Sequence, residues 1–386
     1  MALSTHKIQN LPVAPDFRFL RHASTTEIPV DILQLILVHL DQPDLPTLCR
    51  VNKVCCAYAQ EALYRHLSTE TNFQVYNTLV ESPYLAGLVR SVAVCDLFRK
   101  SDMLVLAQAL RNMSSLRTLK LCFSGYHSWI VSECNFRLSS FLCHFRYDAR
   151  LQAFLDSQPD LTDVTLVTTS DSPPFDYTCL PNISRIAAPL SWVQALVPNR
   201  PVSDVTILAL GDMSDKYVDI DFLSRSTAAI KRLRIDSFYL DDKPAEVVES
   251  VLPSLEHLTV RATTEDYIPR VSGLASVFFS ALSDDTSQGD LLTWLANLLS
   301  VLVSVQSFCI RIESNIPPSE DPRRTEANLP FITTVSSRSP HLRHFAMVYT
   351  YAPVAPHCWS RAQGQWVACR DHYPQPTQQC CPWPRP

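Results

Sequence analysis

The segment Ile28–Leu67 reads IPVDILQLILVHLDQPDLPTLCRVNKVCCAYAQEALYRHL, and its pattern predicts three short amphipathic helices. The first is expected from about Asp31 to Leu40, because its aliphatic side chains recur at helical spacing and form one stripe. A proline-containing turn ends this helix, a second helix is expected to begin near Asp44, and a third near Val54. The segment therefore reads as a small helical domain with an apolar face.

This segment has more large aliphatic side chains than its own centre can bury. About 40 residues is the lower size limit for a self-sufficient core. Surplus apolar surface on so small a unit usually marks an interface with a partner. The alternative is an ordinary helical cap that packs on the rest of the chain.

The order of residues in the segment resembles an F-box. That family has a Leu/Ile-Pro pair, an aliphatic helix, an acidic or proline-containing turn, a Leu-x-x-Leu-x-x-Val run, a basic residue and an aromatic closing segment. The matching residues here are Ile28–Pro29, Ile32 to Leu40, Asp41 to Asp44, Leu45, Leu48, Val51, Lys53 and Leu63–Tyr64. The chain departs from the pattern at Cys55–Cys56, where an Arg- or Trp-bearing stretch is common, and at Tyr64, where Trp is common.

The resemblance implies a substrate receptor of an SCF-type cullin-RING E3 ubiquitin ligase. Such a chain binds a Skp-family adaptor, and through it a cullin, while its remaining domain holds an unknown target protein. It would be no enzyme and would need no cofactor. The residues expected at the adaptor interface, some of which must instead face the interior, are Pro29, Ile32, Leu33, Ile36, Leu37, Leu40, Leu45, Leu48 and Val51.

A loose repeat, aliphatic-x-x-aliphatic-x-aliphatic, recurs nine times after this segment. The copies start at Leu88 (with one extra residue), Leu116, Leu161, Ile183, Val202, Ile230, Leu255, Val305 and Leu342. Four copies have a proline two residues before the first aliphatic: Pro159, Pro181, Pro253 and Pro340. Helical patterns precede several copies, and a helix, a proline turn and a short strand in repetition predict parallel strands with crossover helices.

The repeat resembles a degenerate leucine-rich-repeat array, although the Asn or Cys after the strand is mostly missing and the unit lengths are uneven. The expected fold class is α/β, with a three-helix F-box followed by an irregular leucine-rich-repeat-like solenoid of short parallel strands and helices. A non-solenoid α/β domain is the alternative. The expected boundaries are a disordered lead-in (1–24), the F-box (25–67), a linker (68–87), the repeat domain (88–352) and a disordered Pro/Cys-rich tail (353–386).

In such an array the residues between the aliphatics face the concave side and form the expected target-binding surface. The charged residues at or just after these positions are Lys120, Asp163, Asp204, Arg232, Arg234, His257, Arg261 and Arg311. The alternative for each one is a merely solvated position.

Composition argues against several functions. With 6 glycines, no G-x-G-x-x-G and no Walker loop, a nucleotide site is not expected. A net charge of −5 argues against nucleic-acid binding. No hydrolase or protease motif occurs, so an enzyme would need a site built from scattered residues. A non-catalytic repeat scaffold without a link to ubiquitination remains the other alternative.

The location expected from the sequence is the cytoplasm or the nucleus. The 13 cysteines show no disulfide spacing and no secretory signal is visible at the N-terminus. The apolar run Leu291–Val305 has about 15 residues, short of the roughly 20 that span a membrane, so it predicts a buried helix. His357–Cys358, Cys369, His372 and Cys380–Cys381 have the chemistry of zinc ligands, but their spacing matches no zinc module.

Overall fold

A computed structural model describes most of the chain between Ile32 and Ala368. The described residues are 32, 35–37, 39–68, 73–95, 99–167, 179–208, 220–236, 249–263, 299–313, 332–333, 337, 339–349, 357–362 and 364–368. The chain divides into two units, an N-terminal unit (Met1–Leu63) and a sheet unit (Tyr64–Pro386). We describe each by itself.

The N-terminal unit contains α2 (Leu45–Leu48) and most of α3 (Lys53–Arg65). Pro46 stands in the first turn of α2, where its missing N–H costs nothing. The Asn52 side chain caps α3 by accepting a hydrogen bond of 2.8 Å from the backbone N–H of Cys55. Residues 32 and 35–37 are also helical, as the apolar stripe predicts.

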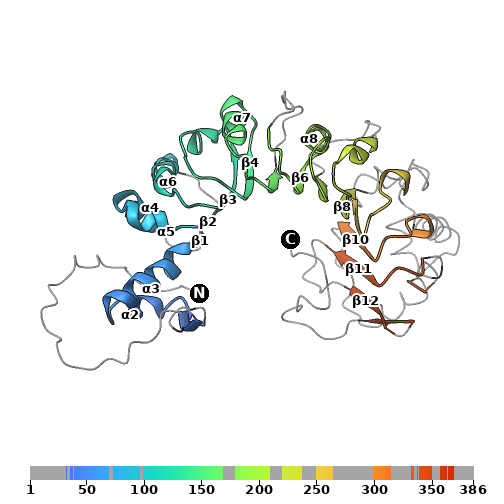
Figure 1. Cartoon of the computed structure of the whole chain (residues 1–386), viewed down its shortest axis with the longest axis horizontal. Coiled ribbons are helices and arrows are strands. Elements are labelled where there is room, and N and C mark those ends of the chain that lie inside the picture. The colour runs from blue at the N-terminus through green and yellow to red at the C-terminus, as the bar shows by residue number, and fades with distance from the viewer. Residues whose placement is uncertain are drawn as a thin grey trace, which may run out of the picture. The chain divides into compact units, whose positions relative to one another are not determined.

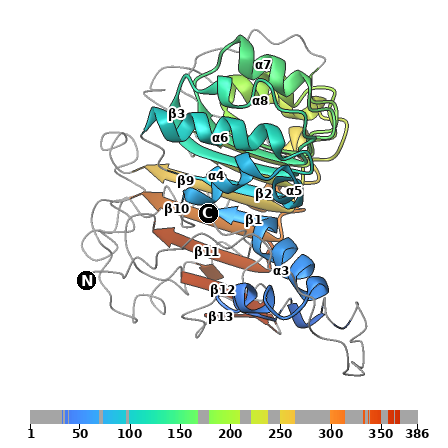
Figure 2. The same cartoon turned by 90° about the vertical axis from the view of Figure 1, so that its left-hand side faces the viewer.

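The sheet unit is built on one 13-stranded sheet whose strands lie in chain order. The strands are β1 (His66–Ser68), β2 (Ser91–Val94), β3 (Thr118–Gly125), β4 (Ser140–Phe145), β5 (Asp163–Leu166), β6 (Arg185–Pro189), β7 (Asp204–Leu208), β8 (Arg232–Asp236), β9 (His257–Thr263), β10 (Ser307–Glu313), β11 (His344–Tyr349), β12 (His357–Ala362) and β13 (Gln365–Ala368). All pairs from β1 to β11 are parallel, and β12 and β13 pair antiparallel. Figure 2 shows β9 to β13 side by side at the end of this series. The predicted α/β fold with parallel strands is therefore confirmed.

Short helices cover one face of this sheet. They are α4 (Gln74–Glu81), α5 (Pro83–Leu88), α6 (Lys100–Asn112), α7 (Ala149–Asp156) and α8 (Leu190–Leu196), with 3-10 turns η1 (Ser128–Ile130) and η2 (Asp221–Arg225). In the sheet unit of Figure 1, the strands follow the inner side of a curved row and α4, α6, α7 and α8 follow the outer side. The Asp148 carboxylate caps α7 through the backbone N–H groups of Arg150 and Leu151.

The repeat pattern explains which face each residue takes. Leu116, Leu119 and Leu121 of one copy are fully buried, whereas Thr118 is half-buried and Lys120 exposed. The same alternation runs through β2, β5 and β7. Because side chains alternate across a strand, the aliphatics pack under the helices and the residues between them form the open strand face.

A backbone ladder joins the repeats at the edge where the strands begin. The carbonyl of Arg90 accepts from the N–H groups of both Arg117 and Thr118, at 2.8 and 3.0 Å. The residues that directly precede the other parallel strands accept at the same place, although Arg65 and Arg343 each accept from one N–H group. We call these residues the edge row: Arg65, Arg90, Arg117, Ser139, Thr162, Ser184, Ser203, Lys231, Glu256, Gln306 and Arg343. The ladder fixes the register of every strand.

A buried arginine closes the turn after α8. Arg200 is 3 % exposed, and its guanidinium donates to the carbonyls of Cys179, Ala195, Leu196 and Pro198 at 2.8 to 3.3 Å. It satisfies the helix C-terminus, whose carbonyls have no partner within the helix. This interaction is structural.

The sheet extends further in both directions than the sequence predicts. The expected linker (68–87), whose first part the sequence marks as a connecting helix or loop, contains α4 and most of α5, which bury Tyr76, Leu79 and Ala86 in the main core. The expectation of a disordered tail is wrong for β12 and β13, since Trp359 and Trp366 are buried. Residues 1–24, 353–356 and 369–386 lie outside the described residues.

No helix among the described residues is long and apolar enough to span a membrane. Of the apolar run Leu291–Val305, only residues 299–305 are described, where a helical turn buries Leu299 and Leu302.

Candidate protein-interaction surfaces

The N-terminal unit exposes large aliphatic side chains. Among its described residues, the core cluster consists of Leu37, Leu45 and Cys55 with a few half-buried side chains around them, and Ala59 is also buried. Five apolar residues instead lie open to solvent, and we call them the apolar face: Ile32 (46 % exposed), Leu35 (61 %), Ile36 (43 %), Val51 (63 %) and Val54 (54 %).

The predicted adaptor-binding residues divide between this face and the core. Ile32, Ile36 and Val51 are exposed, whereas Leu37 and Leu45 are buried. Leu40 and Leu48 are half-buried against the core, and Pro29 and Leu33 lie outside the described residues. The predicted adaptor-binding residues do not include Leu35 and Val54, because helical periodicity marks the centre of an apolar stripe and does not define its edges.

On the sheet unit, the first residue of each strand forms a row across the open face. Backbone register aligns Ser140, Asp163, Arg185, Asp204 and Arg232 on β4 to β8. Arg185 contacts the Asp163 carboxylate at 2.8 Å, and Arg232 contacts that of Asp204 at 3.2 Å. Three of the predicted target-binding residues, Asp163, Asp204 and Arg232, are therefore already paired within the chain.

Exposure within these pairs is uneven. The side chains of Arg185 and Arg232 are 55 % and 53 % exposed, whereas those of Asp163 and Asp204 are 28 % and 23 % exposed. A partner would therefore meet the guanidinium groups. Sequence analysis missed Arg185, although it directly precedes the second aliphatic of its copy and so occupies the same position as Asp163 and Arg232.

The row continues through His257, Ser307 and His344 on β9, β10 and β11. Burial and, to a smaller extent, the positive charge of Arg232 lower the pKa of His257. Burial and the positive charge of Arg343 lower the pKa of His344 in the same way. Nδ1 of His344 is buried without a hydrogen-bond partner among the described residues. Both rings are therefore neutral at pH 7, and Ser307 between them is 1 % exposed.

The other predicted target-binding residues lie further along the strands. Lys120 is exposed on β3 beside Leu142, and Arg234 pairs in register with Thr206 and Thr259. Arg261 and Arg311 are register partners on β9 and β10. The structure thus gathers Arg232, Arg234 and His257 on neighbouring strands and places Lys120 five strands away from β8.

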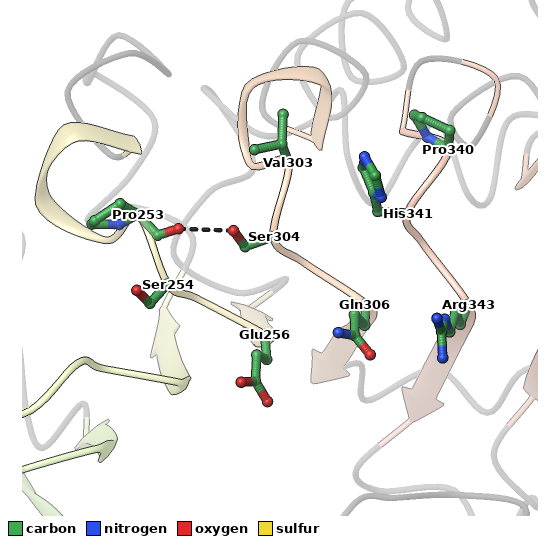
Figure 3. Close-up of a pocket in the computed structure, with 9 residues that line it drawn as sticks. All are labelled: Pro253, Ser254, Glu256, Val303, Ser304, Gln306, Pro340, His341 and Arg343. Atoms are coloured by element: carbon green, nitrogen blue, oxygen red, sulfur yellow. Dashed lines mark hydrogen bonds between the residues drawn. The ribbon is translucent and has the colours of Figure 1, made fainter.

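A shallow groove of about 480 Å³ lies at the edge where β9, β10 and β11 begin. Figure 3 shows that equivalent turns of three copies line it, and that the Ser304 hydroxyl donates to the Pro253 carbonyl at 2.8 Å. Glu256 forms an ion pair of 3.0 Å with Lys231, whose hydrogen bond lowers the pKa of the carboxyl group. The groove is polar, and the negative charge of Glu256 in its lining is already neutralised by Lys231.

Among the described residues, no three His, Cys, Asp or Glu side chains come close enough to hold a metal ion. Burial raises the pKa of Cys143 to about 12 and that of Cys134 to about 12, so these thiols are poor nucleophiles. Of the zinc-ligand types in the tail, His357 and Cys358 lie on β12, and the others lie outside the described residues.

No protein-family model matches the chain. A search of the curated proteins found no match either. The function must therefore be argued from the surfaces themselves.

Proposed function

We propose that the chain is the substrate receptor of an SCF-type cullin-RING E3 ubiquitin ligase. The N-terminal unit acts as an F-box that binds a Skp-family adaptor, and the sheet unit acts as a leucine-rich-repeat-like domain that holds a target protein. The receptor itself catalyses nothing. It raises the effective concentration of target lysines near a ubiquitin-charged enzyme.

The apolar face carries this proposal. Ile32, Ile36 and Val51 belong to the F-box-like pattern, and they stay exposed while Leu37 and Leu45 fill the unit's core. At roughly 25 cal/mol per Å² of apolar area, burying several such side chains against a partner is a substantial driving force. A partner that buries them is thus favoured over continued exposure to water.

The open strand face supports the second half of the proposal. Its arginines at Arg185 and Arg232 are more than half exposed, and arginine is enriched at protein interfaces. The ladder holds the backbone of these short parallel strands, so little backbone conformational entropy is lost when a partner binds.

Co-purification tests the adaptor half. Tagged full-length chain is expected to retain a Skp-family adaptor and a cullin. The double variant Ile36→Asp/Val51→Asp is expected to lose both, because two charges would have to be buried at the interface. The matched control is Leu104→Asp/Val303→Asp, which changes two equally exposed aliphatics of the sheet unit.

The outcomes separate the candidate functions. Loss of the adaptor in the first variant and retention in the control supports the proposal. An adaptor without a cullin favours a scaffold outside ubiquitination. Equal retention in both variants removes the apolar face as the binding site.

A further inference from the structure

The first four turns of the sheet unit carry a stripe of exposed arginines at the edge where the strands begin. Arg65, Arg90 and Arg117 are successive members of the edge row, and Arg137 lies in the turn that follows. All four are exposed. Further along, the edge row changes to the hydroxyl residues Ser139, Thr162, Ser184 and Ser203. Its later cations are Lys231, which pairs with Glu256, and Arg343, so successive arginines occur in the first turns and not in the later ones. We call these four residues the arginine edge.

Three of the four side chains of the arginine edge are held in place by backbone carbonyls. The Arg90 guanidinium donates to the Ser115 carbonyl at 3.1 Å, Arg117 to the Arg137 carbonyl at 3.3 Å, and Arg137 to the Ser157 carbonyl at 3.2 Å. Each side chain thus reaches to the next turn. A guanidinium has five N–H donors, and each of these three arginines uses only one of its nitrogen atoms in these hydrogen bonds.

The positive charge of this edge is not neutralised within the described chain. The ion pairs among the described residues join Arg111 to Glu133, Arg185 to Asp163, Arg232 to Asp204 and Lys231 to Glu256. None involves the arginine edge, and no other interaction of these four side chains occurs among the described residues. Four unpaired cations on a chain of net charge −5 call for an external anion.

We infer that the arginine edge binds an acidic segment of a partner protein. Neighbouring strands lie about 4.8 Å apart, so the stripe is roughly 15 Å long. An extended peptide places side chains on one side about every 6.7 Å, so a stripe of this length matches three alternating Asp or Glu residues. Planar guanidinium groups pair with carboxylates through two hydrogen bonds.

Nucleic acid fits this edge less well. The rest of the chain is net negative and repels a long polyanion, and stable duplex binding commonly uses about 6 to 10 phosphate contacts. The inference does not rest on adaptor binding, because all four residues belong to the sheet unit.

Titration of full-length protein with defined probes tests the inference. The probes are a labelled peptide with alternating glutamates, its glutamine counterpart, and a single-stranded oligonucleotide of mixed sequence. The triple variant Arg90→Gln/Arg117→Gln/Arg137→Gln is expected to bind the glutamate peptide at least about tenfold more weakly than wild type at low salt. Circular dichroism checks that this variant is folded, and the corresponding triple Lys variant is expected to retain part of the binding because it keeps the charge.

A second triple variant has the same net charge as the first. Arg99→Gln, Arg150→Gln and Arg225→Gln remove three exposed arginines that make no side-chain contact among the described residues. This control is expected to change binding by less than about twofold. An equal loss in the control, equal binding of the glutamine peptide, or tighter binding of the oligonucleotide would each overturn the inference.

Discussion

The two units of this chain treat the same kind of side chain in opposite ways. In the sheet unit the aliphatic and aromatic residues of successive repeats close over one another, and Leu119, Phe141 and Phe308 are at most 1 % exposed. In the N-terminal unit, Ile36 and Val51 are 43 % and 63 % exposed. A repeat array buries each apolar face with the next copy, whereas a unit of about 40 residues has no next copy. Among the described residues, this contrast points to the N-terminal unit as the expected binding site for a second polypeptide.

The largest expected difference between the two units is in the stability lost when an apolar side chain is shortened to alanine. Phe308 is fully buried, with its ring centroid 5.8 Å from that of Phe345. Phe308→Ala is expected to lower the free energy of unfolding of the sheet unit by about 3 to 5 kcal/mol, because it removes apolar contacts and leaves a cavity. Ile36→Ala is expected to change stability by about 0.5 kcal/mol or less. Hydrogen exchange resolved by unit measures both, and similar losses in the two variants would contradict the contrast.

The contribution of the buried Arg200 hydrogen bonds to the stability of the sheet unit can be tested by substitution. Arg200→Met keeps much of the volume but leaves the carbonyls of Cys179 and Leu196 without their donor. The expected loss in free energy of unfolding is about 2 to 3 kcal/mol, measured by urea denaturation. Arg225→Gln, at an exposed position, serves as the control and should have almost no effect. Equal stability of the two variants would show that the Arg200 contacts are not needed.

The half-buried His257 and His344 predict a pH dependence within the sheet unit. The pKa values of His257 and His344 are lowered on folding, so the unfolded chain binds more protons than the folded one. Their contribution to stability is complete above about pH 6.5 and is lost as pH falls through the lower pKa values of the folded protein. Thermal unfolding between pH 7 and pH 5 should show this decrease.

The double variant His257→Gln/His344→Gln should flatten that profile. Glu256 does not contribute to the slope between pH 7 and pH 5, because its pKa is lowered from an already acidic value and it titrates below this range. A profile of unchanged slope in the double variant would assign the pH dependence to other groups.

The smallest effect is expected at the exposed ion pairs of the strand face. A double-mutant cycle on Asp204→Asn and Arg232→Gln should give a coupling energy of roughly 0.2 to 1 kcal/mol that decreases with salt. Such a value would leave Arg232 free to exchange its partner for one on a target. A coupling well above this range would mean that the pair is a fixed part of the fold.

The sequence predicts the repeats well because one short pattern defines each copy. All nine predicted copies contain strands, from β2 to β11, and the four proline turns lie directly before β5, β6, β9 and β11. In the first copy the buried residue is Val89, where the sequence suggested Leu88 with an extra residue. β4 was missed because its copy reads Leu138, Phe141 and Cys143, with an aromatic ring and a thiol in place of aliphatics.

The ends of the sheet were harder to predict. β1 has three residues and only one buried side chain, Leu67, so its pattern is too short to recognise. β12 and β13 pair antiparallel and have Trp359 and Trp366 as their buried residues, in a stretch whose many prolines argued against structure. For the candidate sites, the sequence marks which residues are charged or aliphatic, but the pairing of Asp163 with Arg185 depends on register across 22 residues.

Hydrogen–deuterium exchange of the full-length chain, with and without a purified Skp-family adaptor, tests the central claim most directly. The account predicts that adaptor binding slows exchange in the N-terminal unit, in peptides containing Ile36, Val51 and Val54, and leaves β2 to β11 unchanged. No protection in those peptides, or protection confined to the sheet unit, would contradict it.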